Sequence, residues 1–188
     1  MVIVEGDGTT TTPPPTTADQ PSSWAVEQVN AAIAEKLVPQ SLQSKYTQAT
    51  TRAEFCALAV ALYENVKGEI TGRSTFTDTN DVNVQKAASI GVVTGVGDNK
   101  FDPDAQLTRE QAAVMLARLA DAVGKPLAAS APTFADNAQI SSWATEQVGQ
   151  IQAAGIMSGV GSNTFAPKDP YTREQSIITI MRLFGVVK

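Results

Sequence analysis

The sequence repeats itself at a long, fixed interval, and this constrains the fold more than any other feature. The segment Gly91–Leu119 recurs 64 residues later as Gly155–Leu183. Between Gly91–Gln111 and Gly155–Gln175, 11 of 21 positions are identical without a gap. A third copy of the helix start occurs earlier, at Thr51. A period of about 60 residues is typical of an array of supersecondary units, so we expect three repeats.

Each copy contains the helix-start signal Thr-x-x-Glu/Gln before an apolar run. In such a capping box the threonine hydroxyl accepts from the backbone N–H three residues on, and the Glu or Gln side chain reaches back. The helices that follow are apolar over a wide arc, so each needs burial against more than one neighbour. We predict a mainly α fold of three helix-loop-helix repeats in a pseudo-threefold arrangement around a central three-helix bundle. The predicted capping pairs are Thr51 with Glu54, Thr108 with Gln111 and Thr172 with Gln175.

The expected domain boundaries follow from these repeats and from a biased N-terminal segment. Residues 1–18 are rich in Thr and Pro, a composition that cannot pack and favours extended polyproline geometry. The first residues lack both the basic start and the apolar core of a signal peptide. We expect a linker at 1–18, repeats at 19–68, 76–124 and 134–187, and a terminal module of a longer protein.

Composition argues against several classes of function. The 188 residues carry a net charge of −5 with no long run of either sign, which argues against nucleic acid or an anionic membrane as partner. No histidine is present, so the usual metal ligand and neutral-pH acid–base group are missing. The single cysteine, Cys56, lies on an apolar helical face and is expected to be a small buried hydrophobe. We expect no cofactor, no bound metal, no membrane insertion and no enzymatic activity.

Arginine recurs at an unfavourable position. Three of the six arginines (Arg52, Arg109 and Arg173) occupy the first helical position after the capping threonine. The helix dipole disfavours a cation there by a few tenths of a kcal/mol. A guanidinium beside free helix N–H groups is a good receptor for a carboxylate or phosphate. The structural alternative is an ion pair with a loop carboxylate such as Asp98 or Asp104.

The loops between the helices carry further signals. Val92–Gln106 and Ile156–Pro170 are too short for a domain, and we expect them to pair as small extended segments. Phe101 and Phe165 are the apolar residues expected to anchor them in the core. The recurring Asp78 and Asp136 are interpreted as turn or helix caps.

These residues together resemble the S-layer homology domain family. The similarity includes an F-x-D start, a Trp-Ala helix, the loop G-I/V-V/M-x-G-x-G-x-x-x-F-x-P and the helix start T-R-E/A-Q/E, and it extends from about Asp19 to Val187. The resemblance implies a three-pronged unit whose grooves between repeats bind secondary cell-wall polysaccharide. The acidic group recognised in that family is often a pyruvate ketal on a terminal N-acetylmannosamine. The implied location is extracellular, at the cell wall or S-layer of a bacterium.

The family's functional positions can be carried over residue by residue. The resemblance assigns glycan binding to Arg52, Arg109 and Arg173, to Trp24 and Trp143, and to the loop glycines Gly95, Gly97, Gly159 and Gly161. Gly91 and Gly155 are the remaining family glycines. An indole face can stack on a sugar, although each tryptophan could equally pack at a helix start. The glycines could serve turn formation as well as binding.

Two departures from the family pattern limit the number of working grooves. Repeat one lacks the glycine loop, and repeat two lacks the tryptophan, since counting from the glycines places Thr79 opposite Trp143. We expect that not all three grooves bind, and that those using Arg109 or Arg173 are the best candidates. The expected partner is an acidic, pyruvylated wall glycan, bound by a monomer attached to a larger protein.

The sequence leaves three other functions open. Asp98, Asp102 and Asp104 crowd one loop, which suggests calcium, but the spacing fails the EF-hand pattern because Leu107 and Ala113 occupy its glycine and glutamate positions. An enzyme would have to depend on Asp and Glu alone. A purely structural extracellular scaffold without glycan binding is the third.

Overall fold

The structure is a computed structural model that describes residues 20–188, and the expected linker at 1–18 lies outside this range. The described chain is mainly α-helical, which confirms the predicted fold class. Tight 3₁₀ turns occur in repeats one and three. The elements are α1 (Val26–Ala34), η2 (Gln40–Leu42), α2 (Arg52–Lys67), α3 (Val82–Ser89), α4 (Arg109–Ala122), η3 (Asn137–Gln139), α5 (Thr145–Ala153) and α6 (Arg173–Val187).

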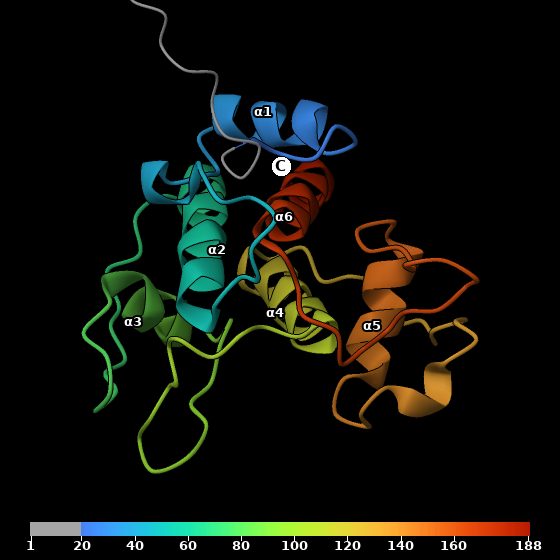
Figure 1. The fold of residues 1–188 in the computed structure, drawn as a ribbon. Coiled ribbons are helices and arrows are strands. Elements are labelled where there is room, and N and C mark those ends of the chain that lie inside the picture. Colours follow the sequence, from blue (N-terminus) through green and yellow to red (C-terminus); the bar gives the residue numbers. More distant parts are fainter. Residues whose placement is uncertain (1–19) are drawn as a thin grey trace, which may run out of the picture.

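The helices form a closed ring of contacts. The second helices of the repeats, α2, α4 and α6, pack against one another at the centre (Figure 1). The first helices lie outside, with α3 against α2, α5 against α4 and α1 against α6. The first helix of each repeat therefore packs on the second helix of the preceding repeat, and repeat one closes on repeat three. A pseudo-threefold arrangement requires this cyclic pairing, although the symmetry itself stays a prediction.

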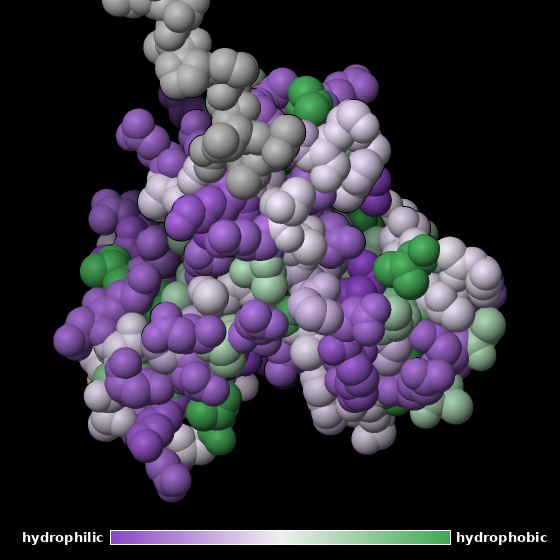
Figure 2. Space-filling view, viewed as in Figure 1, coloured by the Kyte–Doolittle hydropathy of each residue, from purple (hydrophilic) through white to green (hydrophobic). Residues whose placement is uncertain are grey.

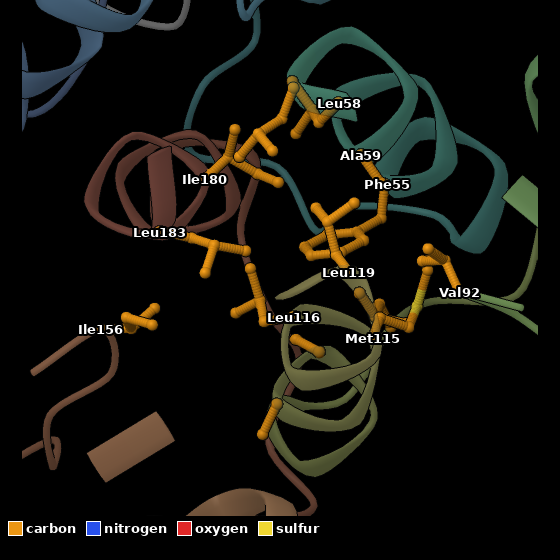
Figure 3. Packing of buried hydrophobic residues seen from close by; sticks show 14 of the residues in the cluster. Phe55, Leu58, Ala59, Val92, Met115, Leu116, Leu119, Ile156, Ile180 and Leu183 are labelled. Atoms are coloured by element: carbon orange, nitrogen blue, oxygen red, sulfur yellow. The ribbon is translucent and has the colours of Figure 1, made fainter. Parts of the chain in front are cut away.

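Large apolar side chains fill the space between the central helices. The residues labelled in Figure 3 converge from all three helices and from the two glycine loops. Burial of this set is the main favourable term in folding. The central contacts are made by Phe55 and Leu58 of α2, Leu116 and Leu119 of α4, and Ile180 and Leu183 of α6, all fully buried.

A cyclic set of backbone hydrogen bonds lies where the three central helices begin. The N–H of Thr50 donates to Tyr171 O at 2.7 Å, that of Tyr171 to Leu107 O at 2.8 Å, and that of Leu107 to Thr50 O at 2.9 Å. All three residues are buried. Because each repeat donates to one neighbour and accepts from the other, no repeat can complete this ring alone.

The helix starts are satisfied within this arrangement. All three predicted capping boxes are present. The first helical N–H groups donate to loop carbonyls of the following repeat: Arg52 N to Ala105 O, Arg109 N to Asp169 O and Arg173 N to Gln48 O, at 2.8–3.1 Å. The expectation of free helix N–H groups beside the arginines is therefore wrong, since those donors already have partners.

The two glycine loops fold as predicted around their phenylalanines. Phe101 and Phe165 are fully buried, which confirms them as core anchors. Their rings pack on Phe76 and Phe134 of the F-x-D segments, with centroids 5.3 and 5.1 Å apart. The expected extended pairing is limited to isolated bridges. Inside the loops Gly97 pairs with Lys100 and Gly161 with Thr164, and at the loop ends Gln106 pairs with Thr51 and Pro170 with Thr108.

The surface and the cysteine agree with the composition. Hydrophilic residues cover most of the face in Figure 2, and hydrophobic ones form small separate patches. Cys56 is buried as expected, and burial raises the pKa of its thiol well above the ordinary value. Within residues 20–188, no helix combines the length and the apolar character needed to cross a bilayer.

Phe101→Ala should lower the free energy of unfolding by about 3–5 kcal/mol, because it removes a buried ring and leaves a cavity. Urea denaturation followed by circular dichroism measures this difference. Val96→Ala in the same loop is the control: this side chain is 59% exposed, and its loss should change stability by less than about 0.5 kcal/mol. Equal effects of the two substitutions would contradict the role of Phe101 as an anchor.

Candidate functional site

Two clefts open between neighbouring repeats on the described surface. The first, here the Arg109 cleft, has a volume of about 270 Å³. It lies between α6, the glycine loop of repeat three and the turn that precedes α1. Its lining includes Trp24, Arg109, Ser158, Gly159 and Arg182.

The second cleft, here the Arg52 cleft, is built from the corresponding parts one repeat earlier. It has a volume of about 170 Å³ and lies against α4 and the glycine loop of repeat two. Its lining includes Arg52, Thr94, Arg118 and Trp143. Each cleft therefore combines groups from all three repeats: an arginine from one, a loop and central helix from the next, and a tryptophan from the third.

Arg109 joins two repeats through main-chain contacts. Its Nε donates to Phe165 O at 2.6 Å and its Nη2 to Ser158 O at 2.7 Å. The guanidinium also lies 5.0 Å from the ring centroid of Phe165 and 5.7 Å from that of Tyr171. Within residues 20–188, Nη1 has no hydrogen-bond partner. The side chain thus holds the loop and still contributes to the cleft wall.

Arg52 repeats this arrangement. Its Nε donates to Phe101 O at 3.0 Å and its Nη2 to Thr94 O at 3.1 Å, with the guanidinium 4.5 Å from the Phe101 centroid. The suggested ion pairs with Asp98 or Asp104 are not formed. The structural alternative of an ion pair with Asp98 or Asp104 is therefore wrong for Arg52 and Arg109.

Arg52 and Arg109 form no direct ion pair within residues 20–188, so their positive charges are compensated only by more distant carboxylates, those of Asp78 and Asp102 for Arg52 and those of Asp136 and Asp169 for Arg109. Carbonyl oxygens satisfy hydrogen bonds but carry no net charge, and a buried charge is costly without a counter-charge. Burial lowers the pKa of both side chains, yet arginine stays protonated in proteins. Burial also raises the pKa of Tyr171 to about 12, so its neutral phenol cannot balance Arg109. Both clefts therefore favour an anionic ligand.

Arg173 lies in a different environment. Its Nη2 forms an ion pair with Glu54 and its Nη1 donates to Ser44 O at 2.6 Å. Its Nε is buried without a partner in residues 20–188, since Ser44 O, which corresponds to Phe101 O and Phe165 O in the register of the backbone bonds, accepts from Nη1 instead. Arg173 lines neither of the two clefts.

The tryptophans are on the surface rather than in the core. Trp24 is 59% exposed and Trp143 is 55% exposed, so packing at a helix start does not explain them. Each lies in a turn just before its helix. Trp24 lines the Arg109 cleft and Trp143 the Arg52 cleft, which brings both together with predicted arginines.

Repeat two lacks the whole tryptophan turn. Asp78 precedes Gly91 by 13 residues, whereas Asp136 precedes Gly155 by 19, so repeat two is six residues shorter here. The alignment of Thr79 with Trp143 was an artefact of counting from the glycines. The third groove, which Arg173 would form with repeats one and two, therefore has no tryptophan.

The loop glycines are explained first by backbone geometry. A Cβ on Gly95 would lie 2.7 Å from Lys100 O, and one on Gly159 would lie 2.6 Å from Thr164 O. Gly97 and Gly161 have positive φ values of 114° and 135°, which a side chain would strain. Only Gly159 is found in the lining of a cleft.

The recurring aspartates anchor the glycine loops. Of their interpretation as turn or helix caps, the helix cap is wrong, because neither side chain bonds to the start of a helix. Asp136 accepts from the N–H groups of Phe165 at 2.7 Å and Ala166 at 2.8 Å, and Asp78 does the same for Phe101 and Asp102 at 2.9 and 2.8 Å. Burial alone would raise the pKa of Asp136, but these hydrogen bonds outweigh it and hold the pKa below its ordinary value.

Two further arginines belong to the clefts. Arg118 and Arg182 lie nine residues after the first arginines of α4 and α6 and were not among the predicted site residues. Arg182 donates to Gln28 at 3.0 Å and to Ile156 O at 3.3 Å, whereas Arg118 has no hydrogen-bond partner within the described chain. Their equal spacing from the capping threonines is the signal that could have identified them.

No group of three acidic, thiol or imidazole side chains gathers into a metal-binding cluster within residues 20–188. The crowded Asp98, Asp102 and Asp104 of repeat two do not converge into such a group.

Comparison with known proteins adds independent information. The S-layer homology domain model matches residues 75–113 and 133–175. An amylopullulanase from Thermoanaerobacterium thermosulfurigenes is 29% identical over 174 residues, and the exoglucanase XynX from Acetivibrio thermocellus is 28% identical over the same length. Each alignment covers 88% of this chain but only 9% and 16% of the relatives.

Asp136→Asn should lower the free energy of unfolding at neutral pH by about 1–3 kcal/mol, because the amide cannot accept from both loop N–H groups. The folded pKa lies below the ordinary value of 3.8, so the stabilisation is fully present above that value and is lost as the pH falls through the folded pKa. The difference between wild type and variant should therefore be constant down to about pH 5 and shrink in stronger acid.

Denaturant titrations across this pH range measure the effect. Asp121→Asn, at an exposed position of α4, is the charge-matched control and should leave stability unchanged. A difference between wild type and Asp136→Asn that does not shrink as the pH falls from about 5 to about 2 would contradict the assignment.

Proposed function

Residues 75–113 and 133–175 belong to the S-layer homology domain family, and on this basis we propose that the chain is a non-enzymatic module that anchors a larger protein to the bacterial cell wall. Its ligand is an acidic secondary cell-wall polysaccharide, bound in the Arg109 and Arg52 clefts. The assignment of residues 19–68 as a third repeat of the same family, with a degenerate loop, is part of this proposal.

The observation that carries the proposal is the pairing of an exposed indole with a guanidinium that has no direct ion-pair partner in residues 20–188. It occurs twice, as Trp24 with Arg109 and as Trp143 with Arg52. A second guanidinium, from Arg182 or Arg118, lines the same clefts. Exposed tryptophan in a concave, positively charged site has no role in core packing, and it occurs at corresponding places although the two turns are 119 residues apart.

The chemistry of a pyruvylated sugar fits these groups. A pyruvate ketal places a carboxylate on a sugar ring, and a guanidinium binds a carboxylate by charge-assisted hydrogen bonds. The apolar C–H face of the ring can stack on the indole, whose N–H can donate to a hydroxyl. Gly159 adds space for the ligand beside the loop backbone in the Arg109 cleft.

The third groove is not proposed as a site. Arg173 is paired with Glu54, repeat two supplies no tryptophan turn, and repeat one has no glycine loop. The sequence-based preference for Arg109 is kept, whereas Arg52 replaces Arg173 as the second candidate. Gly95, Gly97 and Gly161 act through loop shape in this proposal, and Gly159 also through the cleft surface.

The relatives support a role as one module among several. Both are named as carbohydrate-active enzymes, and this chain spans only 9% and 16% of their lengths. We place the module outside the cell, bound non-covalently to the wall as a monomeric unit, while catalysis in such proteins belongs to other domains. Nucleic acid and membrane insertion have no part in this function.

Trp24→Ala and Trp143→Ala should each weaken binding at one cleft by at least about tenfold, or about 1.4 kcal/mol, and the double variant should lose wall binding. Because both side chains are more than half exposed, stability should change by less than about 0.5 kcal/mol. Sedimentation with purified cell walls and calorimetry with soluble wall polysaccharide measure the effect. Val82→Ala, also exposed, is the control. Full wall binding by the double variant would refute the proposed sites.

A synthetic N-acetylmannosamine carrying a pyruvate ketal should bind about 10–100-fold more tightly than the same sugar without the ketal. The reason is that a hydrogen bond to a charged group contributes about 1.5–3 kcal/mol. Arg118→Ala removes from the Arg52 cleft a guanidinium that has no partner among residues 20–188, and it should reduce this preference there. Equal affinity for the two sugars, measured by calorimetry, would show that the acidic group is not recognised.

A further inference from the structure

Two buried carboxylates lie behind the tryptophan turns. Glu174 and Glu110 occupy the second helical positions of α6 and α4 and are 4% and 3% exposed. Each extends into a different repeat. Glu174 accepts from Ser22 N and Ser22 Oγ, both at 2.8 Å, and Glu110 accepts from Ser141 N at 2.9 Å and Ser141 Oγ at 3.0 Å.

Each of these serines begins the turn that presents a tryptophan. The carbonyl of Ser22 accepts from Ala25 N at 2.8 Å, which closes a tight turn around Trp24, and the carbonyl of Ser141 accepts from Ala144 N at 2.9 Å around Trp143. The alanines that follow are fully buried, while the indoles project outward. The direction of each exposed ring is therefore set by its turn, and the carboxylate fixes where the turn begins.

The remaining repeat provides an internal comparison. The position that corresponds to Glu110 and Glu174 in α2 is Ala53, which cannot form this contact. The segment that it would hold, between Asp78 and α3, is the one that is six residues shorter and has no tryptophan turn. The carboxylate and the turn are thus present together twice and absent together once.

We infer that Glu174 and Glu110 are positioning residues for the glycan site. Each accepts two hydrogen bonds from the serine of a tryptophan turn, an arrangement here called the clasp. The clasp holds Trp24 over the Arg109 cleft, and Trp143 over the Arg52 cleft, before ligand binds. This inference rests on the proposed function. An indole that is ordered in advance loses less conformational freedom on binding, which improves affinity without any new contact to the ligand. The glutamates touch no ligand themselves.

The two clasps differ in one respect that guides the choice of test. Lys168 also pairs with Glu110 and donates to Ser141 Oγ, so substitutions at Glu110 remove an ion pair as well as the clasp. Glu174 has no ion-pair partner within the described chain. Variants at Glu174 therefore report on the clasp more directly.

The test uses a Trp143→Phe background, in which Trp24 is the sole tryptophan of the chain. In the absence of ligand, Glu174→Ala should lower the fluorescence anisotropy of Trp24 and increase its quenching by acrylamide. In calorimetry with the ketal-bearing sugar, affinity at the Arg109 cleft should fall about tenfold. Glu174→Gln, which can accept from Ser22 N and donate to Ser22 Oγ, should restore most of both properties. Glu27→Ala removes an exposed carboxylate three residues from Trp24 and should change neither.

A second variant covers the case in which Glu174→Ala does not fold. Ser22→Ala lies outside the central helices, removes only the hydroxyl contact and should loosen Trp24 in the same direction by a smaller amount. Unchanged Trp24 mobility in the folded variants overturns the inference, whether or not their binding is weaker. The mobility measurement needs no ligand, so it tests whether the clasp orders Trp24 even if the wild-type protein does not bind the sugar. Failure of the wild-type protein to bind the sugar would refute the proposed function and not the clasp.

Discussion

The buried start of a helix needs acceptors for its first N–H groups, and in this protein those acceptors come from a neighbouring repeat. The N–H groups of the first arginine of each central helix donate to carbonyls of the next loop, and Thr50, Leu107 and Tyr171 join the three starts in a closed ring. Unsatisfied buried N–H groups are costly, so each repeat depends on the next for its stability.

This exchange of loops also creates the candidate site. Where a glycine loop passes beneath a neighbouring helix start, the arginine at that start binds its carbonyls and stacks on its phenylalanine, as Arg52 does with Phe101 and Arg109 with Phe165. The guanidinium thereby gains hydrogen bonds without losing its charge. An arginine that links two repeats can therefore also bind an anion, because its hydrogen-bond partners are neutral carbonyl groups. Arg173, whose partner is the carboxylate of Glu54, shows the other outcome of the same geometry.

Features encoded locally could be predicted from the sequence, and features that depend on distant partners could not. The capping boxes and the burial of Phe101 follow from short patterns, and the structure confirms both. No local pattern indicates that a helix start donates to the loop of the next repeat, so the N–H groups were wrongly expected to be free. The same applies to the partner of Arg173, because Glu54 is recognisable only as a capping residue. The shorter segment after Asp78 was visible in the sequence, but counting from the glycines concealed it.

The central claim is that two of the three arginines at helix starts carry charge available to an anion and the third does not. Nuclear magnetic resonance of the arginine Nε–H groups during titration with the ketal-bearing sugar tests it directly, since each side chain reports on its own cleft. The account predicts saturable shifts for Arg52 and Arg109 and none for Arg173. A shift confined to Arg173, or no shift at any of the three, would contradict it.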